Sequence, residues 1–213
     1  MKIKLDKVMP KPLESIKHSE KSIWGNVIEL IPQKKIMLNA SSGKGKSTFA
    51  TTVFGLRNDY TGSISYDGID IKTLSVDDWT DIRKSKLSVV FQDLQLFPKL
   101  SVRENLLLKN SLTDTYSEQE LKHHLQLLEI EDKWEQKCGL LSMGQQQRVA
   151  IFRSLAQPFD WLIMDEPFSH LDEENTQRCL RLIDTRTNEL NAGFVLTSLG
   201  DNHNFNFDQE LNL

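Results

Sequence analysis

The chain has 213 residues, which suits one ordinary domain and is short for two. Its 26 basic and 30 acidic residues give a formal net charge of −4, with both signs mixed along the chain. A protein that mainly grips nucleic acid would carry a basic excess or stripe, so no nucleic-acid partner is expected. The two cysteines and the absence of any apolar run near the roughly 18 residues of a membrane helix argue against a secreted or membrane-spanning protein.

Strand and helix patterns alternate in the first half of the chain. A helix is predicted from Ser47 to Phe54, closed by Gly55. Asp67 and Gly68 predict the turn of a hairpin. Short runs of strand type are found at residues 2–8, 27–31, 35–39, 64–66 and 87–91.

The middle of the chain is helical from residue 101 to residue 128, where Ser101 with Glu104 and Ser117 with Glu120 have the spacing of capping boxes. After Ser142 the alternation returns. A helix to about residue 155 is followed by a strand at 161–164, a helix at 172–190 and a strand at 194–197.

This order predicts an α/β fold with a mostly parallel sheet, a small antiparallel β part and an inserted helical subdomain. Residues 1–213 are expected to form one unit. Its core lobe takes about 1–91 and 142–213, and the helical subdomain takes about 92–141.

A loop of phosphate-binding type (P-loop) lies between a buried strand and a helix, with alanine in place of its first glycine. Its residues are Ala40, Ser41, Ser42, Gly43, Lys44, Gly45, Lys46 and Ser47, followed by Thr48. Backbone N–H groups of such a loop surround a β-phosphate, while Lys46 reaches the β- and γ-oxygens and Ser47 binds Mg²⁺. The competing interpretation is a surface loop before a helix, which Gly-Lys-Ser-Thr after a buried strand disfavours.

A second candidate site follows the apolar run at 161–164, which ends in Asp165 and Glu166. Ligands of parallel sheets bind at the carboxyl ends of the strands. Asp165 is therefore predicted to hold Mg²⁺, and Glu166 to polarise an attacking water. Without the P-loop, two acids after a strand would be interpreted as a solvated turn.

Three further motifs resemble those of the ATP-binding cassette (ABC) ATPases. Val89 to Gln92 resembles the Q-loop of that family, and Ser169 to Asp172 resembles its D-loop. The family signature Leu-Ser-Gly-Gly-Gln, followed by Gln-Gln-Arg, is matched with one change by Leu141, Ser142, Met143, Gly144 and Gln145. The resemblance covers about residues 25–198.

The resemblance implies an ATPase that uses ATP and Mg²⁺. Lys46, Gln92 and Glu166 are its expected catalytic residues, and Ser47, Gln92 and Asp165 its expected metal ligands. Two cassettes, as a homodimer or a heterodimer, would pair head to tail and sandwich ATP between one P-loop and the other chain's signature. Since no membrane span is predicted, a separate permease is expected, with the cassette in the cytoplasm on the inner face of the membrane.

The chain departs from the family at two places. Ser198 stands where the family carries a histidine that contacts the γ-phosphate, which predicts slow hydrolysis. His203 is interpreted as a solvated loop side chain, with replacement of that histidine as the alternative. No aromatic residue precedes Trp24 to stack on adenine; Trp24 is interpreted as a core residue, and His18 as a weak stacking candidate.

Three functions therefore remain open. The first is the ATPase subunit of a transporter, with Gly55 to Arg57 and residues 79–91 resembling the lipoprotein-releasing and macrolide-exporter branch. The second is a non-transport ABC ATPase, disfavoured because only 49 residues separate Gln92 from Leu141, too few for a long coiled-coil insert. The third is a degenerate cassette that binds ATP as a switch; Ser198 favours this reading and Glu166 opposes it.

Overall fold

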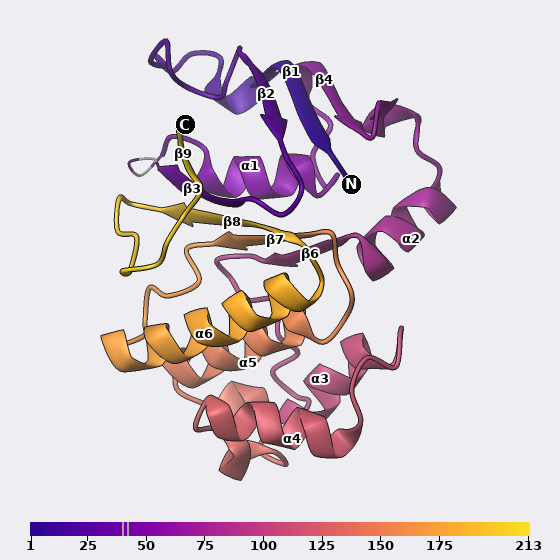
Figure 1. Cartoon of the computed structure of the whole chain (residues 1–213), viewed down its shortest axis with the longest axis vertical. Coiled ribbons are helices and arrows are strands. Elements are labelled where there is room, and N and C mark those ends of the chain that lie inside the picture. Colours follow the sequence, from indigo (N-terminus) through magenta and orange to yellow (C-terminus); the bar gives the residue numbers. More distant parts are fainter. Residues whose placement is uncertain (40, 42) are drawn as a thin grey trace.

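A computed structural model shows two β-sheets with a helix packed between them (Figure 1). They form the upper part of the molecule in the view of Figure 1. The structure describes residues 1–39, 41 and 43–213. The helix is α1 (Lys46–Val53), which lies between the two sheets. Helices α5 (Met143–Leu155) and α6 (Glu173–Glu189) cover the opposite face of the larger sheet, and α3 (Val102–Asn110) and α4 (Glu118–Leu127) lie beyond them (Figure 1). Helix α2 (Val76–Ser85) lies to one side of the sheets.

The larger sheet is parallel throughout, as the alternation of strands and helices predicts. Successive residues of β7 belong to different cores: Trp161 and Ile163 join the core toward α1, while Leu162 and Met164 join the core toward the other helices. A strand covered on both faces reads as a continuous apolar run, which is why 161–164 looks buried in the sequence. Across the sheet the strands are β6 (Leu87–Val90), β7 (Trp161–Asp165), β8 (Gly193–Ser198), β3 (Lys35–Asn39) and β9 (Gln209–Asn212).

The smaller sheet is antiparallel and caps α1. Asp67 and Gly68 form the turn of its hairpin with φ of +48° and +89°, the backbone that a tight hairpin turn requires. The predicted hairpin is therefore confirmed. The strands across this sheet are β2 (Val27–Leu30), β1 (Ile3–Pro10), β4 (Tyr60–Tyr66) and β5 (Ile69–Asp70).

Both predicted capping boxes are confirmed at the starts of α3 (Val102–Asn110) and α4 (Glu118–Leu127). Leu121, Leu125 and Leu128 are fully buried, because their spacing places them on one helix face. These leucines belong to the core on the helical side of the larger sheet, to which α5 (Met143–Leu155) and α6 (Glu173–Glu189) also contribute residues. Short 3-10 helices are found at Lys11–Leu13, Ile71–Thr73, Glu131–Lys133 and Cys138–Leu140.

Two elements escaped the sequence analysis. Helix α2 (Val76–Ser85) begins with a capping box of Ser75 and Asp78, and no residue of it is fully buried, although Trp79 and Ile82 pack half-buried against the core. Strand β9 is polar and mostly exposed, because it is an edge strand with one neighbour. Hydrophobic periodicity does not reveal elements of this kind.

Both cysteines are buried and free. Burial raises the pKa of Cys138 to about 11 and that of Cys179 to about 12, so neither thiol ionises near neutral pH. In the parts of the chain that the structure describes, no helix has both the length and the apolar character needed to cross a membrane.

Gly55 closes α1 in the manner predicted, as the residue after the C-cap. Its φ is +70°, its N–H donates to the Thr52 carbonyl, and the next N–H, of Leu56, donates to the Thr51 carbonyl. These two bonds form a Schellman motif. A Cβ atom at Gly55 would lie 2.1 Å from Cη2 of Trp79, the ring that α2 places there.

Gly55→Ala is expected to destabilise the protein more than Gly68→Ala. Both glycines have positive φ, which costs an alanine roughly 1–2 kcal/mol. A Cβ at Gly68 meets open space, whereas at Gly55 it overlaps Trp79 and should cost about 1–3 kcal/mol more. Urea unfolding of both variants measures the difference, and equal losses would contradict the packing role of Gly55.

Candidate functional site

The carboxyl ends of three parallel strands bring the two candidate sites of the sequence together. The register pairs Asn39 of β3 with Ser198 of β8, and Thr197 of β8 with Asp165 of β7. The segments that follow these strands therefore leave the sheet at one edge. Lys46, the first residue of α1, lies there with its Nζ 3.1 Å from Oε1 of Glu166. Its side chain is only 6 % exposed.

Thr197 connects the two acidic residues. Its hydroxyl donates to Oδ1 of Asp165 at 2.7 Å and accepts the backbone N–H of Glu166 at 3.3 Å. Glu166 has a φ of +47°, so the chain turns sharply as it leaves β7. The sequence analysis treated Thr197 only as a strand residue. Thr197 lies on β8, between β7 and the strand β3 that leads into the P-loop, a position that only the strand register reveals.

Two neighbouring cavities lie at this edge. The first cavity has a volume of about 270 Å³ and is lined by residues of the predicted P-loop. The second has a volume of about 640 Å³ and is lined by residues at the ends of β6 and β7. Ser47 and Gln92 line both of them. The described lining of the first is Leu13, Gly43, Gly45, Lys46, Ser47, Thr48, Gln92, Glu166 and Leu199, and Asp165 lines the second.

The donor set at the junction of the cavities suits Mg²⁺. Asp165 is 1 % exposed, and within the described part of the chain its Oδ2 is buried without a hydrogen-bond partner. Ser47 and Gln92 are exposed and supply a hydroxyl and an amide oxygen. Carboxylate, hydroxyl and carbonyl oxygens are the ligands that Mg²⁺ prefers. The residues predicted from the sequence as metal ligands therefore fit this ion.

The segment before β2 supports the P-loop from outside. Trp24 is 3 % exposed and belongs to the core, as predicted, and its Nε1 donates to the Lys44 carbonyl at 3.3 Å. A Cβ at Gly45, whose φ is +103°, would lie 2.6 Å from Cδ1 of Leu13. Leu13 lines the smaller of the two cavities. Nε2 of His18, the weak stacking candidate, lies 3.0 Å from the Leu13 carbonyl oxygen. Ala40 and Ser42, two of the predicted P-loop residues, lie outside the described residues.

The signature segment forms the start of α5, away from both cavities. Ser142 is the N-cap and shares a capping box with Gln145. Met143 is 46 % exposed, and a Cβ at Gly144 would lie 2.9 Å from the His170 carbonyl oxygen. Leu141 is buried. The described residues that line the two cavities include none of these five, so a single chain does not join its signature to its P-loop.

The predicted D-loop residues contact α5 and begin α6. Ser169 accepts a hydrogen bond from Nε2 of Gln147 at 2.9 Å. Asp172 is the N-cap of α6 and accepts the Asn175 N–H at 2.8 Å; this bond and others from Asn175 hold the pKa of Asp172 below its ordinary value. Gln147 is 1 % exposed and belongs to the Gln-Gln-Arg that follows the signature. The sequence analysis assigned it no role of its own, although a polar residue between apolar positions of a helix can mark a buried polar contact.

Ser198 and His203 lie in a third, smaller cavity beside Glu166. The Ser198 hydroxyl donates to the Asp201 carbonyl at 2.6 Å and accepts the Asp201 N–H at 3.0 Å, so it closes a turn. The interpretation of His203 as solvated is wrong. Its side chain is 20 % exposed, its Nδ1 lies 3.3 Å from Oδ2 of Asp201, and its ring packs edge-on against Phe168.

Comparison with known proteins gives a consistent family. A family model described as "ABC transporter" matches residues 27–169. The lipoprotein-releasing system ATP-binding protein LolD of Buchnera aphidicola subsp. Schizaphis graminum is 34 % identical over 165 residues, which cover 76 % of this chain and 72 % of LolD. Two uncharacterized ABC transporter ATP-binding proteins from strains of Mycobacterium tuberculosis are 32 % identical over 151 residues, 70 % of this chain. The chain matches 46 % of the length of these two relatives.

Solved structures share the fold over nearly the whole chain. The dimeric structure of MJ0796, a bacterial ABC transporter cassette, matches with a TM-score of 0.81 and 26 % identity, covering 99 % of this chain and 94 % of that chain. A dimeric post-hydrolysis state of MJ0796 bound to ADP and Pi matches with a TM-score of 0.77 and 27 % identity, covering 93 % and 88 %.

Thr197→Val is expected to lower the free energy of unfolding by about 1–3 kcal/mol, because the nearly isosteric side chain leaves Oδ1 of the buried Asp165 without its donor. Thr197→Ser keeps the hydroxyl and loses one methyl group, so it should cost about 0.8 kcal/mol. Urea unfolding compares the two. If serine cost as much as valine, the hydroxyl would have no role beyond filling space.

Proposed function

The chain belongs to the ABC transporter family, and on that premise we propose that it is the ATP-binding and ATP-hydrolysing subunit of a transporter. The observation that carries the proposal is the gathering of Lys46, Asp165, Glu166 and Gln92 around two adjoining cavities at the N-terminus of α1. Phosphate is the ligand that this end of a helix favours, because unpaired N–H groups and the helix dipole face it.

ATP would be held by the P-loop. Gly43 and Gly45 have φ of +78° and +103°, backbone conformations that let successive N–H groups face a phosphate. The ammonium group of Lys46 would exchange its contact with Glu166 for the β- and γ-oxygens of ATP. Nucleotide binding would thereby release the Glu166 carboxylate.

Hydrolysis would use the carboxylate so released. Glu166 would accept a proton from the attacking water, and Thr197 would orient the turn that carries Glu166 through the hydrogen bond to its N–H. Ser47, Gln92 and Asp165 would hold Mg²⁺. When bound, the ion neutralises charge on the phosphate oxygens.

A second cassette would complete each nucleotide site. The signature helix α5 begins with an intact capping box, so its remaining free N–H groups present partial positive charge outward. Because none of the described cavity-lining residues near the P-loop comes from the signature, the γ-phosphate would meet it on another chain. The dimeric MJ0796 cassette supports a pairing of two such chains.

The partner that crosses the membrane would be a separate permease, with this chain bound at the inner face of the membrane in the cytoplasm. The relative LolD, named for lipoprotein release, supports a role in a multi-subunit transporter. Residues 92–141 would act as a helical subdomain between the nucleotide and that permease, and the core lobe would take residues 1–91 and 142–213.

Glu166→Gln is expected to bind ATP about three- to tenfold more tightly and to hydrolyse it about 10²–10⁴-fold more slowly. The amide no longer competes as an anion for Lys46, and it cannot take up the proton of the water. A fluorescent ATP analogue measures affinity, and steady-state phosphate release measures turnover.

Lys46→Ala is the control for that experiment and should lose ATP binding. Size-exclusion chromatography of Glu166→Gln with Mg-ATP should also reveal a dimer, since the sandwich forms and persists without hydrolysis. Undiminished hydrolysis by Glu166→Gln would overturn the assignment of the base. Unchanged affinity in Lys46→Ala would overturn the P-loop assignment and with it the proposed function.

Ser198→His is expected to raise turnover from a slow wild-type rate. The Ser198 hydroxyl is committed to the backbone of Asp201, and the family's histidine would add a donor to the γ-phosphate, worth about 10²–10³ in rate. Ser198→Ala removes the same turn bonds without adding a donor and is the matched control.

His203→Ala should change turnover little, because the described lining of the cavity that holds Lys46 does not include His203. Steady-state phosphate release on the four proteins compares these effects. A dead His203→Ala variant beside a silent Ser198→His variant would place the missing histidine at 203 and contradict this prediction.

A further inference from the structure

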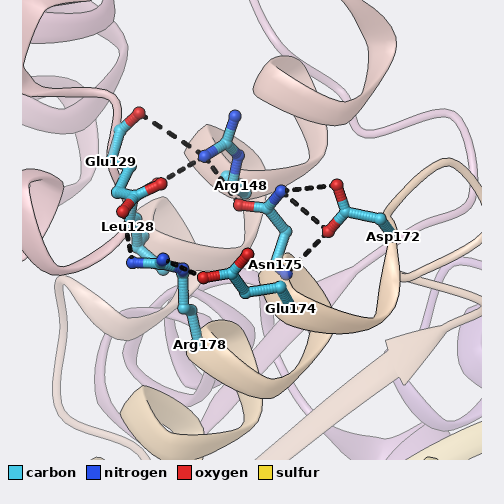
Figure 2. Close-up of polar contacts among 7 residues, drawn as sticks. All are labelled: Leu128, Glu129, Arg148, Asp172, Glu174, Asn175 and Arg178. Carbon is cyan, nitrogen blue, oxygen red and sulfur yellow. Dashed lines mark hydrogen bonds and ion pairs between the residues drawn. The ribbon is translucent and has the colours of Figure 1, made fainter.

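Hydrogen bonds outside the nucleotide cavities join three segments that lie far apart in the sequence (Figure 2). Arg148 of α5 donates through Nη1 to the Leu128 carbonyl at the end of α4, at 2.5 Å, and to Oδ1 of Asn175 in α6, at 2.9 Å. Nδ2 of Asn175 in turn donates to both carboxylate oxygens of Asp172, at 2.9 and 3.0 Å. One side chain, Asn175, therefore connects the signature helix to the N-cap of α6.

The chemistry of each position suits this connection. The last carbonyls of a helix have no intrahelical partner, and a cation there is favourable, so the guanidinium of Arg148 stabilises the end of α4. An amide can accept from a guanidinium and donate to a carboxylate at the same time. Neither an acid nor a base at position 175 could do both, so the identity of Asn175 matters as well as its size.

Helix α5 also contacts the segment between β7 and α6 directly. Buried Gln147, next to Arg148, donates to Ser169 and accepts the His170 N–H at 3.0 Å. Gly144 lies so close to the His170 carbonyl that a Cβ would stand 2.9 Å from its oxygen. The start of α5 thus contacts residues 169–171.

A second arginine reinforces the cluster from the solvent side. Arg178 pairs with Glu129 at 2.7 Å and with Glu174 at 2.5 Å (Figure 2). The side chains of these two acids are 58 % and 76 % exposed, and ion pairs in such a setting contribute little. The contacts of Arg148 with the Leu128 carbonyl and with Asn175 are partly buried, whereas the bonds from Asn175 to Asp172 lie at the surface. The two Arg148 contacts are therefore the main ones that hold α4, α5 and α6 together.

We propose that Arg148 and Asn175 are positioning residues that make the start of α5, residues 169–172 and the end of α4 move as one body. The inference rests on the proposed function, in which the start of α5 meets the nucleotide of a partner cassette. Joined in this way, the signature and the D-loop reach the partner together. Losing the connection would leave ATP binding at the P-loop intact and would slow the later steps.

Asn175→Ala tests the proposal most cleanly. It removes the amide but keeps the Asn175 backbone N–H that caps α6 through Asp172. The expected result is a fall in kcat of about tenfold, with the Kd of a fluorescent ATP analogue unchanged within about twofold. Arg148→Lys keeps the charge, but its side chain ends one atom short of the Nη1 position that makes both contacts, so it should show the same split. Glu174→Gln, on the same helix turn, is the matched control and should behave as wild type.

The double variant Arg148→Lys/Asn175→Ala decides whether the two residues act through each other. If Arg148 and Asn175 act through the same hydrogen-bonded connection, the first substitution already breaks it and the second removes no further interaction. The kcat of the double variant should therefore be no lower than that of the slower single variant. Losses that multiply, a Kd that weakens along with kcat, or an unchanged kcat in Asn175→Ala would each overturn the proposal.

Hydrogen exchange separates this inference from the proposed function. Backbone amides at 125–130 should exchange faster in nucleotide-free Asn175→Ala than in wild type or Glu174→Gln, because Arg148 loses the contact that holds it at the end of α4. Equal exchange would overturn the connection itself. A wild type that turns over no ATP would overturn the proposed function, and the exchange comparison would still decide the inference.

Discussion

Parallel pairing of β3, β8 and β7 forces three strands to end at the same edge of one sheet. Because of that constraint, Lys46, which follows β3, meets Glu166, which follows β7, although 120 residues separate them. Thr197 of the strand between them holds both acidic residues. Alternate residues of β7 and β8 are buried in two separate cores, and this burial fixes the two strands that carry the acidic residues and Thr197.

The Lys46–Glu166 contact gives the nucleotide-free site a defined state. A buried ammonium group needs an anion, and Glu166 supplies one. In the proposed function a phosphate would take the place of Glu166. The same carboxylate is the proposed base, so binding of ATP and readiness for hydrolysis would be linked through one ion pair. Asp165 differs from its neighbour, because Oδ1 accepts a hydrogen bond from Thr197 while Oδ2, within the described part of the chain, has no hydrogen-bond partner. Asp165 lines the larger cavity, where it is a proposed Mg²⁺ ligand.

A second polar cluster lies beyond residues 169–172, the predicted D-loop. There Arg148 and Asn175 join α4, α5 and α6, whereas Lys46 and Glu166 join α1 to the end of β7. Asp172 and Glu166 are separated by a short segment that also carries Ser169. The segment between β7 and α6 therefore has the nucleotide site at one end and the proposed connection to α4 at the other, which is a physical route by which one could affect the other.

Local spacing and continuous apolar runs in the sequence were sufficient to predict the family and most helices and strands. The same patterns predict the P-loop and place two acids directly after β7. The sequence analysis missed α2 and β9, which bury too little apolar surface to leave a periodic pattern. Only the tertiary structure decided that Lys46 pairs with Glu166, that Thr197 holds Asp165, and that Asn175 links Arg148 to Asp172. These contacts depend on strand register and helix packing, which are set by the whole chain and not by any one segment.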